Sequence, residues 1–195
     1  MQDAIVGRWA RESHLTAGIQ RSLCELNHRF LDLAAGRTEW SAMQVAPLTS
    51  AQRAAAAACP YALFDLRFAD ETHWRTRLQN SPSWQVQDEL MAGDDVSFVR
   101  LALFFAWHVA ASAGLAAQLM LGMNLNTVAA FRRTPLNRLP ALVASETAHL
   151  SARWSGCTGY WSALVAAASR SDPAALRRVQ LYGLQLAAAS RLEER

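Results

Sequence analysis

Apolar residues recur at three- and four-residue spacings through most of the chain, which is the period of an amphipathic helix. The clearest run predicts a helix over residues 12–35 that Gly36 ends. Further helices are expected over residues 50–59, 70–78, 96–121, 127–133 and 136–149, and a last one starts at Asp172-Pro173. Residues 61–68 form the one segment where a short strand is expected. The pattern predicts an all-α fold, a helical bundle with a long central apolar helix.

Breaks in this pattern divide the chain into three regions. These are an N-terminal helical region (1–93), a central helical region (94–156) and a C-terminal helical hairpin (157–195). An alternative is that all three form one compact domain, which the length of 195 residues allows. No internal repeat is visible in the sequence.

Composition excludes two classes of protein. With 52% hydrophobic and 18% charged residues, the chain has too much apolar material for a disordered protein and enough length to bury a core without disulfides. The net charge is +3, and all 19 basic residues are arginine. Such a mild positive balance is compatible with an anionic partner without requiring one.

The cysteines and the N-terminal segment indicate a reducing cytoplasm. Cys24, Cys59 and Cys157 are odd in number and far apart, so neither a disulfide framework nor a cysteine-rich zinc site is expected. Residues 1–14 carry several charges and lack the apolar core of a signal peptide. Residues 101–123 contain no charged side chain and are long enough to span a bilayer, but their many alanines favour a buried central helix over a membrane span.

A helix-turn-helix-like corner is expected over residues 114–133. Gly122 supplies the tight turn, and the apolar positions that would face each other across the corner are Ala117, Leu121, Val128 and Phe131. The second helix starts with Asn126-Thr127 and ends with Arg132-Arg133, side chains that suit contacts with bases or phosphates.

A wider stretch of the chain, residues 101–154, resembles the bacterial flagellar transcriptional activator FlhD. The resemblance is carried by the apolar run 101–107, the turn Leu121-Gly122-Met123-Asn124, the segment 134–142 and the pair Arg153-Trp154. It covers less than a third of the chain. The acidic positions that usually follow the asparagine in this family are Leu125 and Asn126 here.

The resemblance implies a dimeric helical subunit that acts in promoter binding with a partner subunit, FlhC, which carries zinc. The leading hypothesis is therefore a cytoplasmic transcriptional regulator that binds DNA alone or with an FlhC-like partner. It would present the following residues to DNA: Asn126, Thr127, Arg132, Arg133 and Arg138. No catalytic motif is legible, and no enzyme activity or cofactor is expected.

Two alternatives stay open. A helical adaptor without nucleic acid would bind a protein partner through tryptophans in or beside loops, namely Trp40, Trp74 and Trp84. A di-metal oxidase would use two Glu-x-x-His pairs, Glu25 with His28 and Glu146 with His149, since this spacing places a carboxylate and an imidazole on one helical face.

Overall fold

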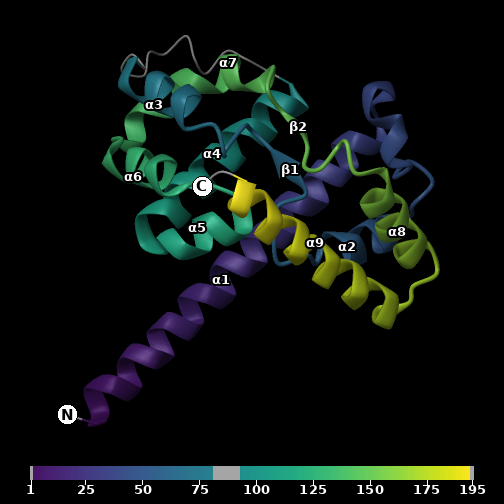
Figure 1. Ribbon diagram of the computed structural model, residues 1–195, viewed down its shortest axis with the longest axis horizontal. Coiled ribbons are helices and arrows are strands. Elements are labelled where there is room, and N and C mark those ends of the chain that lie inside the picture. Colours follow the sequence, from purple (N-terminus) through teal and green to yellow (C-terminus); the bar gives the residue numbers. More distant parts are fainter. Residues whose placement is uncertain (1, 81–92, 194–195) are drawn as a thin grey trace.

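Helices form most of the protein in a computed structural model that describes residues 2–80 and 93–193, with side chains described for 17–80 and 93–190 (Figure 1). The first range contains α1 (Gln2–Ala35), the 3-10 helix η1 (Thr38–Met43), α2 (Ser50–Ala57), β1 (Phe64–Asp65) and α3 (Glu71–Asn80). The second contains α4 (Asp94–Ser112), α5 (Gly114–Leu121), α6 (Leu125–Arg133), the 3-10 helices η3 (Leu136–Arg138) and η4 (Pro140–Leu142), α7 (Val143–Thr147), β2 (Ser151–Ala152), α8 (Thr158–Ser169) and α9 (Pro173–Glu193). The all-α prediction is confirmed.

Several helices begin where the sequence supplies a cap. The Thr49 side chain accepts the N–H of Gln52 at 3.3 Å, and the Gln52 side chain accepts the N–H of Thr49 at 2.9 Å, which forms a capping box at α2. Asp172 accepts the N–H of Ala175 at 3.0 Å at the start of α9. These caps explain why the helix starts at residues 50 and 173 were predictable.

The long helix expected over residues 96–121 is divided into α4 and α5. Ala113 has φ −147° and ψ 68°, outside the helical region, and separates the two. After this break Gly114 approaches α6 so closely that a Cβ on it would lie 3.2 Å from Val128 Cγ1. The change of direction brings α5 against α6, a tertiary contact that the apolar pattern does not encode.

The single helix expected over residues 136–149 is wrong. This segment forms η3, η4 and the short α7, and residues 151–152 then form β2. Pro140 starts η4, because proline has no N–H to donate and is tolerated at the first turn of a helix but not in its interior.

Two parts of the chain repeat the same local structure. Trp74 Nε1 donates a hydrogen bond to the carbonyl oxygen of Leu66 at 3.2 Å, and Trp161 Nε1 donates to the carbonyl oxygen of Arg153 at 3.0 Å. The separation along the chain is 87 residues for both pairs, from 74 to 161 and from 66 to 153.

The same separation relates whole elements. It takes β1 to β2, the start of α3 to the start of α8, and the start of η1 to the start of α6. It also takes Arg67 to Trp154, two non-glycine residues with positive φ values of 56° and 54°. We call residues 2–80 unit 1 and residues 94–169 unit 2. The sequence shows no internal repeat because few side chains match between the units, and the relationship is visible only in the positions of the elements.

The two units pair about an approximate twofold axis. β1 and β2 are antiparallel, with Phe64 opposite Ala152 and Asp65 opposite Ser151. Since Ser151 is the counterpart of Phe64 and Ala152 that of Asp65, the pairing is self-complementary, as at a twofold interface. The helices also cross between units: α3 packs on α6, and α8 packs on η1 and α2. Figure 1 shows α3 and α8 on opposite sides of the strand pair.

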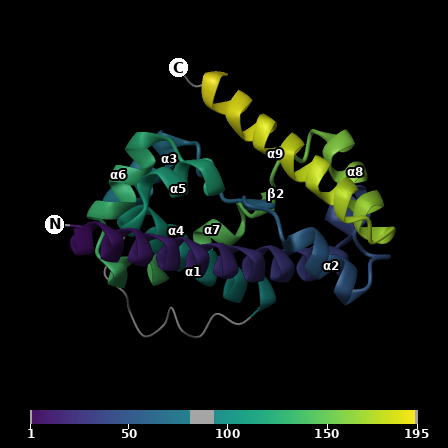
Figure 2. The ribbon, with the colours of Figure 1, turned by 90° about the horizontal axis from the view of Figure 1, so that it is seen from below.

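One hydrophobic core joins the units, with buried residues from all three regions named in the sequence analysis. α4 contacts α1, α5, α6 and α7. α9 follows unit 2 and packs on α8, and in Figure 2 it lies on the side of the molecule opposite α1.

α4 alone among the described helices is long and apolar enough to span a membrane, with 19 residues and a mean hydropathy of 1.2. Half of that window is buried inside the protein. Packing against four other helices accounts for its apolar composition, as in the core helix of a soluble bundle.

Candidate functional site

The helix-turn-helix-like corner is present between α5 and α6. Gly122 ends α5 with a left-handed φ of 75°, and Asn124 caps α6 by accepting the N–H of Thr127 at 2.7 Å. The left-handed backbone favours glycine here, and a Cβ on Gly122 would also lie 2.7 Å from Arg153 Nη2 and displace that guanidinium. The apolar positions expected between the helices are all buried: Ala117, Leu121, Val128 and Phe131.

The N-terminal end of α6 contacts the start of α3 through two asparagine side chains. Asn124 Nδ2 donates to the carbonyl oxygen of Ala69 at 2.9 Å, and Asn126 Nδ2 donates to Glu71 Oε2 at 2.8 Å. Thr127 is 1% exposed. The prediction that Thr127 contacts DNA is therefore wrong. Asn126 is exposed, but its side-chain amide already donates a hydrogen bond to the Glu71 carboxylate.

A groove of about 510 Å³ lies between α3 and α6. Arg75 of α3, Arg133 of α6 and Arg138 of η3 line this α3–α6 groove, and Arg132 is exposed on the same helix as Arg133. Glu71 is the one acidic residue among the described lining residues, with Oε1 3.4 Å from Arg75 Nη1. Within the described part of the chain, Arg133 and Arg138 form no ion pair.

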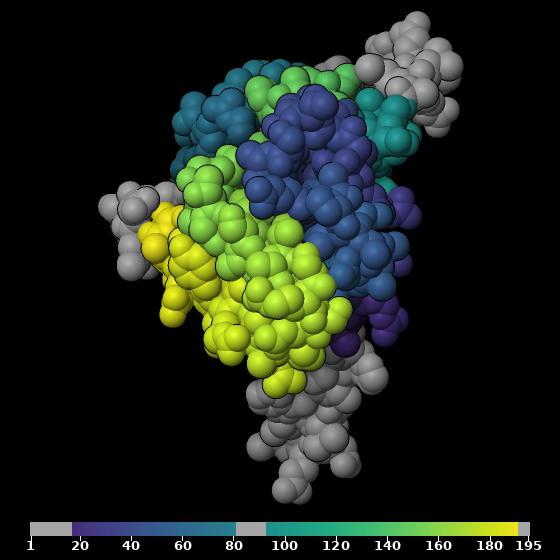
Figure 3. Space-filling model, turned by 90° about the vertical axis from the view of Figure 1, so that its right-hand side faces the viewer, coloured from purple at the N-terminus to yellow at the C-terminus, as the bar shows by residue number. Residues whose placement is uncertain are grey.

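The twofold relationship produces a second groove, of about 570 Å³, between η1 and α8. Figure 3 faces the side of the molecule where η1 and α2 lie beside α8 and α9. Ala46 lines this η1–α8 groove at the position equivalent to Arg133, and Val165 lines it at the position equivalent to Leu78. The fold therefore forms this groove twice, with different side chains.

Arg37 is the one arginine among the described residues of the η1–α8 groove, and carboxylates neutralise it. Its Nη1 lies 2.6 Å from Glu39 Oε1, and its Nη2 contacts Asp95. The guanidinium also lies 5.1 Å from the ring centroid of Trp40. Unpaired arginine is thus a property of the α3–α6 groove and not of its counterpart.

The three tryptophans predicted to bind a partner have different surroundings. Trp40 is half-buried in the η1–α8 groove and packs 5.3 Å from the Phe30 ring. Trp74 is 0% exposed, so its predicted role as a partner surface is wrong: α3 turns this side chain into the core against Phe131. Trp84 lies outside the described residues.

The four residues considered for a di-metal site do not form one group. Glu25 is exposed on α1, and His28 on the same helix has Nε2 3.9 Å from Asp32 Oδ2. Among the described residues, the group that could hold a metal ion contains Glu146 and His149 but neither Glu25 nor His28. The first pair lies on α1 and the second on α7 and the turn after it, and the fold does not bring these two pairs together. The spacing of residues in the sequence contains no information on this separation.

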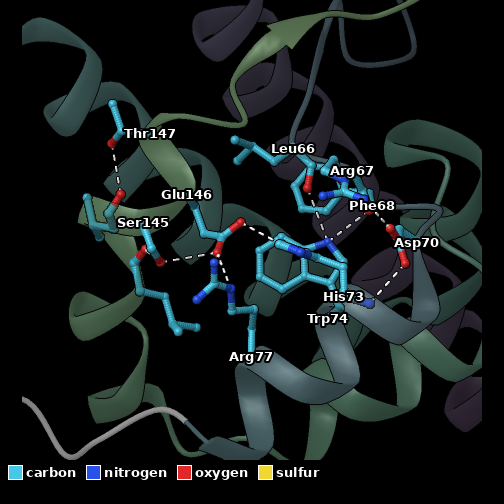
Figure 4. Close-up of polar contacts among 12 residues, drawn as sticks. Leu66, Arg67, Phe68, Asp70, His73, Trp74, Arg77, Ser145, Glu146 and Thr147 are labelled. Carbon is cyan, nitrogen blue, oxygen red and sulfur yellow. Dashed lines mark hydrogen bonds and ion pairs between the residues drawn. The ribbon is translucent and has the colours of Figure 1, made fainter.

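His73 of α3 completes the group around Glu146 and was missed by the sequence analysis. His73 Nε2 lies 2.8 Å from Glu146 Oε2 (Figure 4). The rings of His73 and His149 are 5.0 Å apart. His73 precedes Glu146 by 73 residues, so no local spacing could have indicated this contact. We call these three residues the His–Glu–His cluster.

Glu146 is a fully buried carboxylate that several donors hold in place. Its Oε1 accepts a hydrogen bond from Ser145 Oγ at 3.2 Å and lies 3.4 Å from Arg77 Nε (Figure 4). Both carboxylate oxygens of Glu146 thus have partners inside the protein.

No protein-family model, curated protein or solved structure matches the chain. Functional assignment therefore depends on the α3–α6 groove and the His–Glu–His cluster.

Proposed function

We propose that the protein is a cytoplasmic DNA-binding regulator without catalytic activity, and that its α3–α6 groove binds the phosphate backbone. The observation that carries this proposal is the convergence of Arg75, Arg133 and Arg138 from three elements on one groove. Guanidinium groups bind phosphate oxygens through paired N–H donors, and such contacts supply most of the affinity for DNA.

Two further features support this role. The equivalent η1–α8 groove has alanine and neutralised arginine, so the arginines of the α3–α6 groove are not needed to build the fold. The groove also adjoins the α5–α6 corner, which carries the most specific part of the resemblance to FlhD. With Thr127 buried, base recognition by the start of α6 is not part of the proposal, and an FlhC-like partner would supply it.

The pairing of the two units bears on the oligomeric state that the resemblance implied. One chain already contains two units about a twofold axis, the arrangement that a homodimer would otherwise create. We therefore propose that the isolated chain acts as a monomer of 21.4 kDa. Light scattering would overturn this if it gave twice that mass.

The test of DNA binding uses a duplex of random sequence and the double variant Arg133→Ala/Arg138→Ala. Loss of two phosphate contacts should weaken binding roughly tenfold at low salt and reduce the slope of log K against log salt by about 1.8. Fluorescence anisotropy over a series of salt concentrations measures both quantities.

The matched control is Arg177→Ala/Arg178→Ala, which removes two exposed arginines from α9 and leaves the groove intact. It lowers the net charge equally and should keep the wild-type slope. Equal losses of affinity in the two double variants would mean that DNA binding depends on the net charge of the protein and not on the groove. No DNA binding by the wild-type chain would favour the adaptor alternative.

A further inference from the structure

The His–Glu–His cluster brings together three metal-ligand side chains from both units. His73 lies on α3 of unit 1, and Glu146 and His149 belong to α7 and the turn after it in unit 2. One ligand atom from each residue lies within 4.8 Å of the others. A zinc ion with ligand bonds of about 2.0–2.2 Å requires ligand atoms roughly 3–3.5 Å apart, so small side-chain rotations suffice to surround an ion.

The twofold relationship shows that the fold does not need these residue types at this place. The counterparts of His73 and Glu146 are Tyr160 and Cys59, and Tyr61 lies one position from the counterpart of His149. This equivalent group is neutral, because burial raises the pKa of Cys59 to about 12. Tyr160 Oη donates to Tyr61 Oη at 3.2 Å.

Moving a carboxylate from water into the core costs more free energy than moving tyrosine and cysteine side chains to the equivalent place. The equivalent positions are filled without a carboxylate or an imidazole. A carboxylate and two imidazoles at this place therefore suit a bound ligand as well as the ion pair with Arg77.

The two places also differ in access. α9 covers the tyrosine group, where Tyr61 Oη donates to the carbonyl oxygen of Val179 at 3.3 Å. His73 instead lines a surface groove of about 650 Å³ together with Asp70, Thr76 and Arg77. His73 is the cluster residue that reaches this groove, while Glu146 lies buried behind it.

We propose that His73, Glu146 and His149 bind one divalent transition-metal ion, with zinc as the best match for two imidazoles and a carboxylate. Glu146 Oε2 and His73 Nε2 face each other and would both turn to the ion. Ser145 and Arg77 hold Oε1, the kind of outer contact that orients metal-binding carboxylates. Three protein ligands leave the fourth position of a tetrahedral ion for water or a further ligand.

The test uses the full chain after chelator treatment and removal of the chelator. Isothermal titration with zinc chloride should give one ion per chain, and cobalt(II) should give a visible absorption band typical of a low-coordinate site. His149→Ala is the main variant, because no hydrogen bond anchors this ring in the described residues, and it should weaken zinc binding at least tenfold.

His28→Ala is the matched control, since it removes a half-buried histidine of α1 outside the cluster and should change zinc affinity less than twofold. Zinc should raise the melting temperature of the wild type and of His28→Ala but not that of His149→Ala. Absence of stoichiometric zinc in the wild type overturns the proposal, as does unchanged affinity in a folded His149→Ala or Glu146→Gln variant. These results do not depend on the DNA-binding proposal.

Discussion

Trp74 and Trp161 make the same hydrogen bond in the two units, each donating its indole N–H to the carbonyl oxygen eight residues earlier in the chain. Both carbonyls precede a residue with positive φ that turns the chain from the strand into the following helix. Each tryptophan thus fixes a strand–turn–helix segment in its own unit.

Replacing either tryptophan with phenylalanine keeps the ring in the core but leaves a buried carbonyl oxygen without its donor. Trp74→Phe and Trp161→Phe should each lower the free energy of unfolding by about 1–3 kcal/mol. Urea denaturation followed by circular dichroism measures the loss. Trp40→Phe is the control, because Trp40 is half-buried and should cost less than about 1 kcal/mol. A control loss as large as the other two would contradict the role given to the hydrogen bond.

Gly183→Ala should destabilise the protein through a clash. A Cβ at Gly183 of α9 would collide with the Tyr61 hydroxyl, which is already bonded to the carbonyl oxygen of Val179. The expected loss is about 1–3 kcal/mol, as for other overpacked sites. Gly159→Ala in α8 is the comparison, because that position has open space and alanine favours a helix. In thermal melts, the melting temperature of Gly183→Ala should therefore fall, and that of Gly159→Ala should rise or stay the same.

Glu71→Gln should strengthen DNA binding. Glu71 is the acidic residue in the α3–α6 groove, and the amide can still accept the hydrogen bond from Asn126. Removing one negative charge near phosphate should raise the affinity roughly two- to fivefold at low salt, with a smaller effect at high salt. Glu25→Gln removes an exposed carboxylate of α1 and serves as the control. Anisotropy titrations that show no difference between the variants would place the DNA elsewhere.

Cys157 should react with iodoacetamide at pH 8 at least about tenfold faster than Cys59. The hydrogen bond with Tyr182 lowers the pKa of the Cys157 thiol, and burial raises the pKa of Cys59 to about 12. Peptide mapping by mass spectrometry at several reaction times measures both rates. In guanidinium chloride the two rates should converge, and similar rates in the native protein would contradict the burial of Cys59.

Local features of the sequence were sufficient for the helices that carry their own start and stop signals. Gly36 marks the end of α1, Thr49 the start of α2 and Asp172-Pro173 the start of α9. Gly122 was recognisable as a turn, because the left-handed conformation it adopts is strained for other residues. The short strand was also predicted, within residues 61–68.

Features that depend on contacts between distant residues were not predictable. The chain breaks at Ala113 because α5 packs on α6, and Trp74 and Thr127 are buried because α3 packs on α6. Asn27 is an example of a buried polar residue. Its side chain forms hydrogen bonds with the backbone of Ala57, Tyr61 and Leu63. Nothing in the sequence distinguishes it from an asparagine on the surface.

The sequence by itself determined the fold class and the ends of those helices that carry a cap or a terminal glycine, since periodicity and capping act within a few residues. The tertiary structure decided which side chains meet. The twofold pairing of the units, the arginines of the α3–α6 groove and the His–Glu–His cluster all join residues far apart in the chain. These residues are close because α3 packs against unit 2. That packing depends on contacts throughout the core and not on any local sequence pattern.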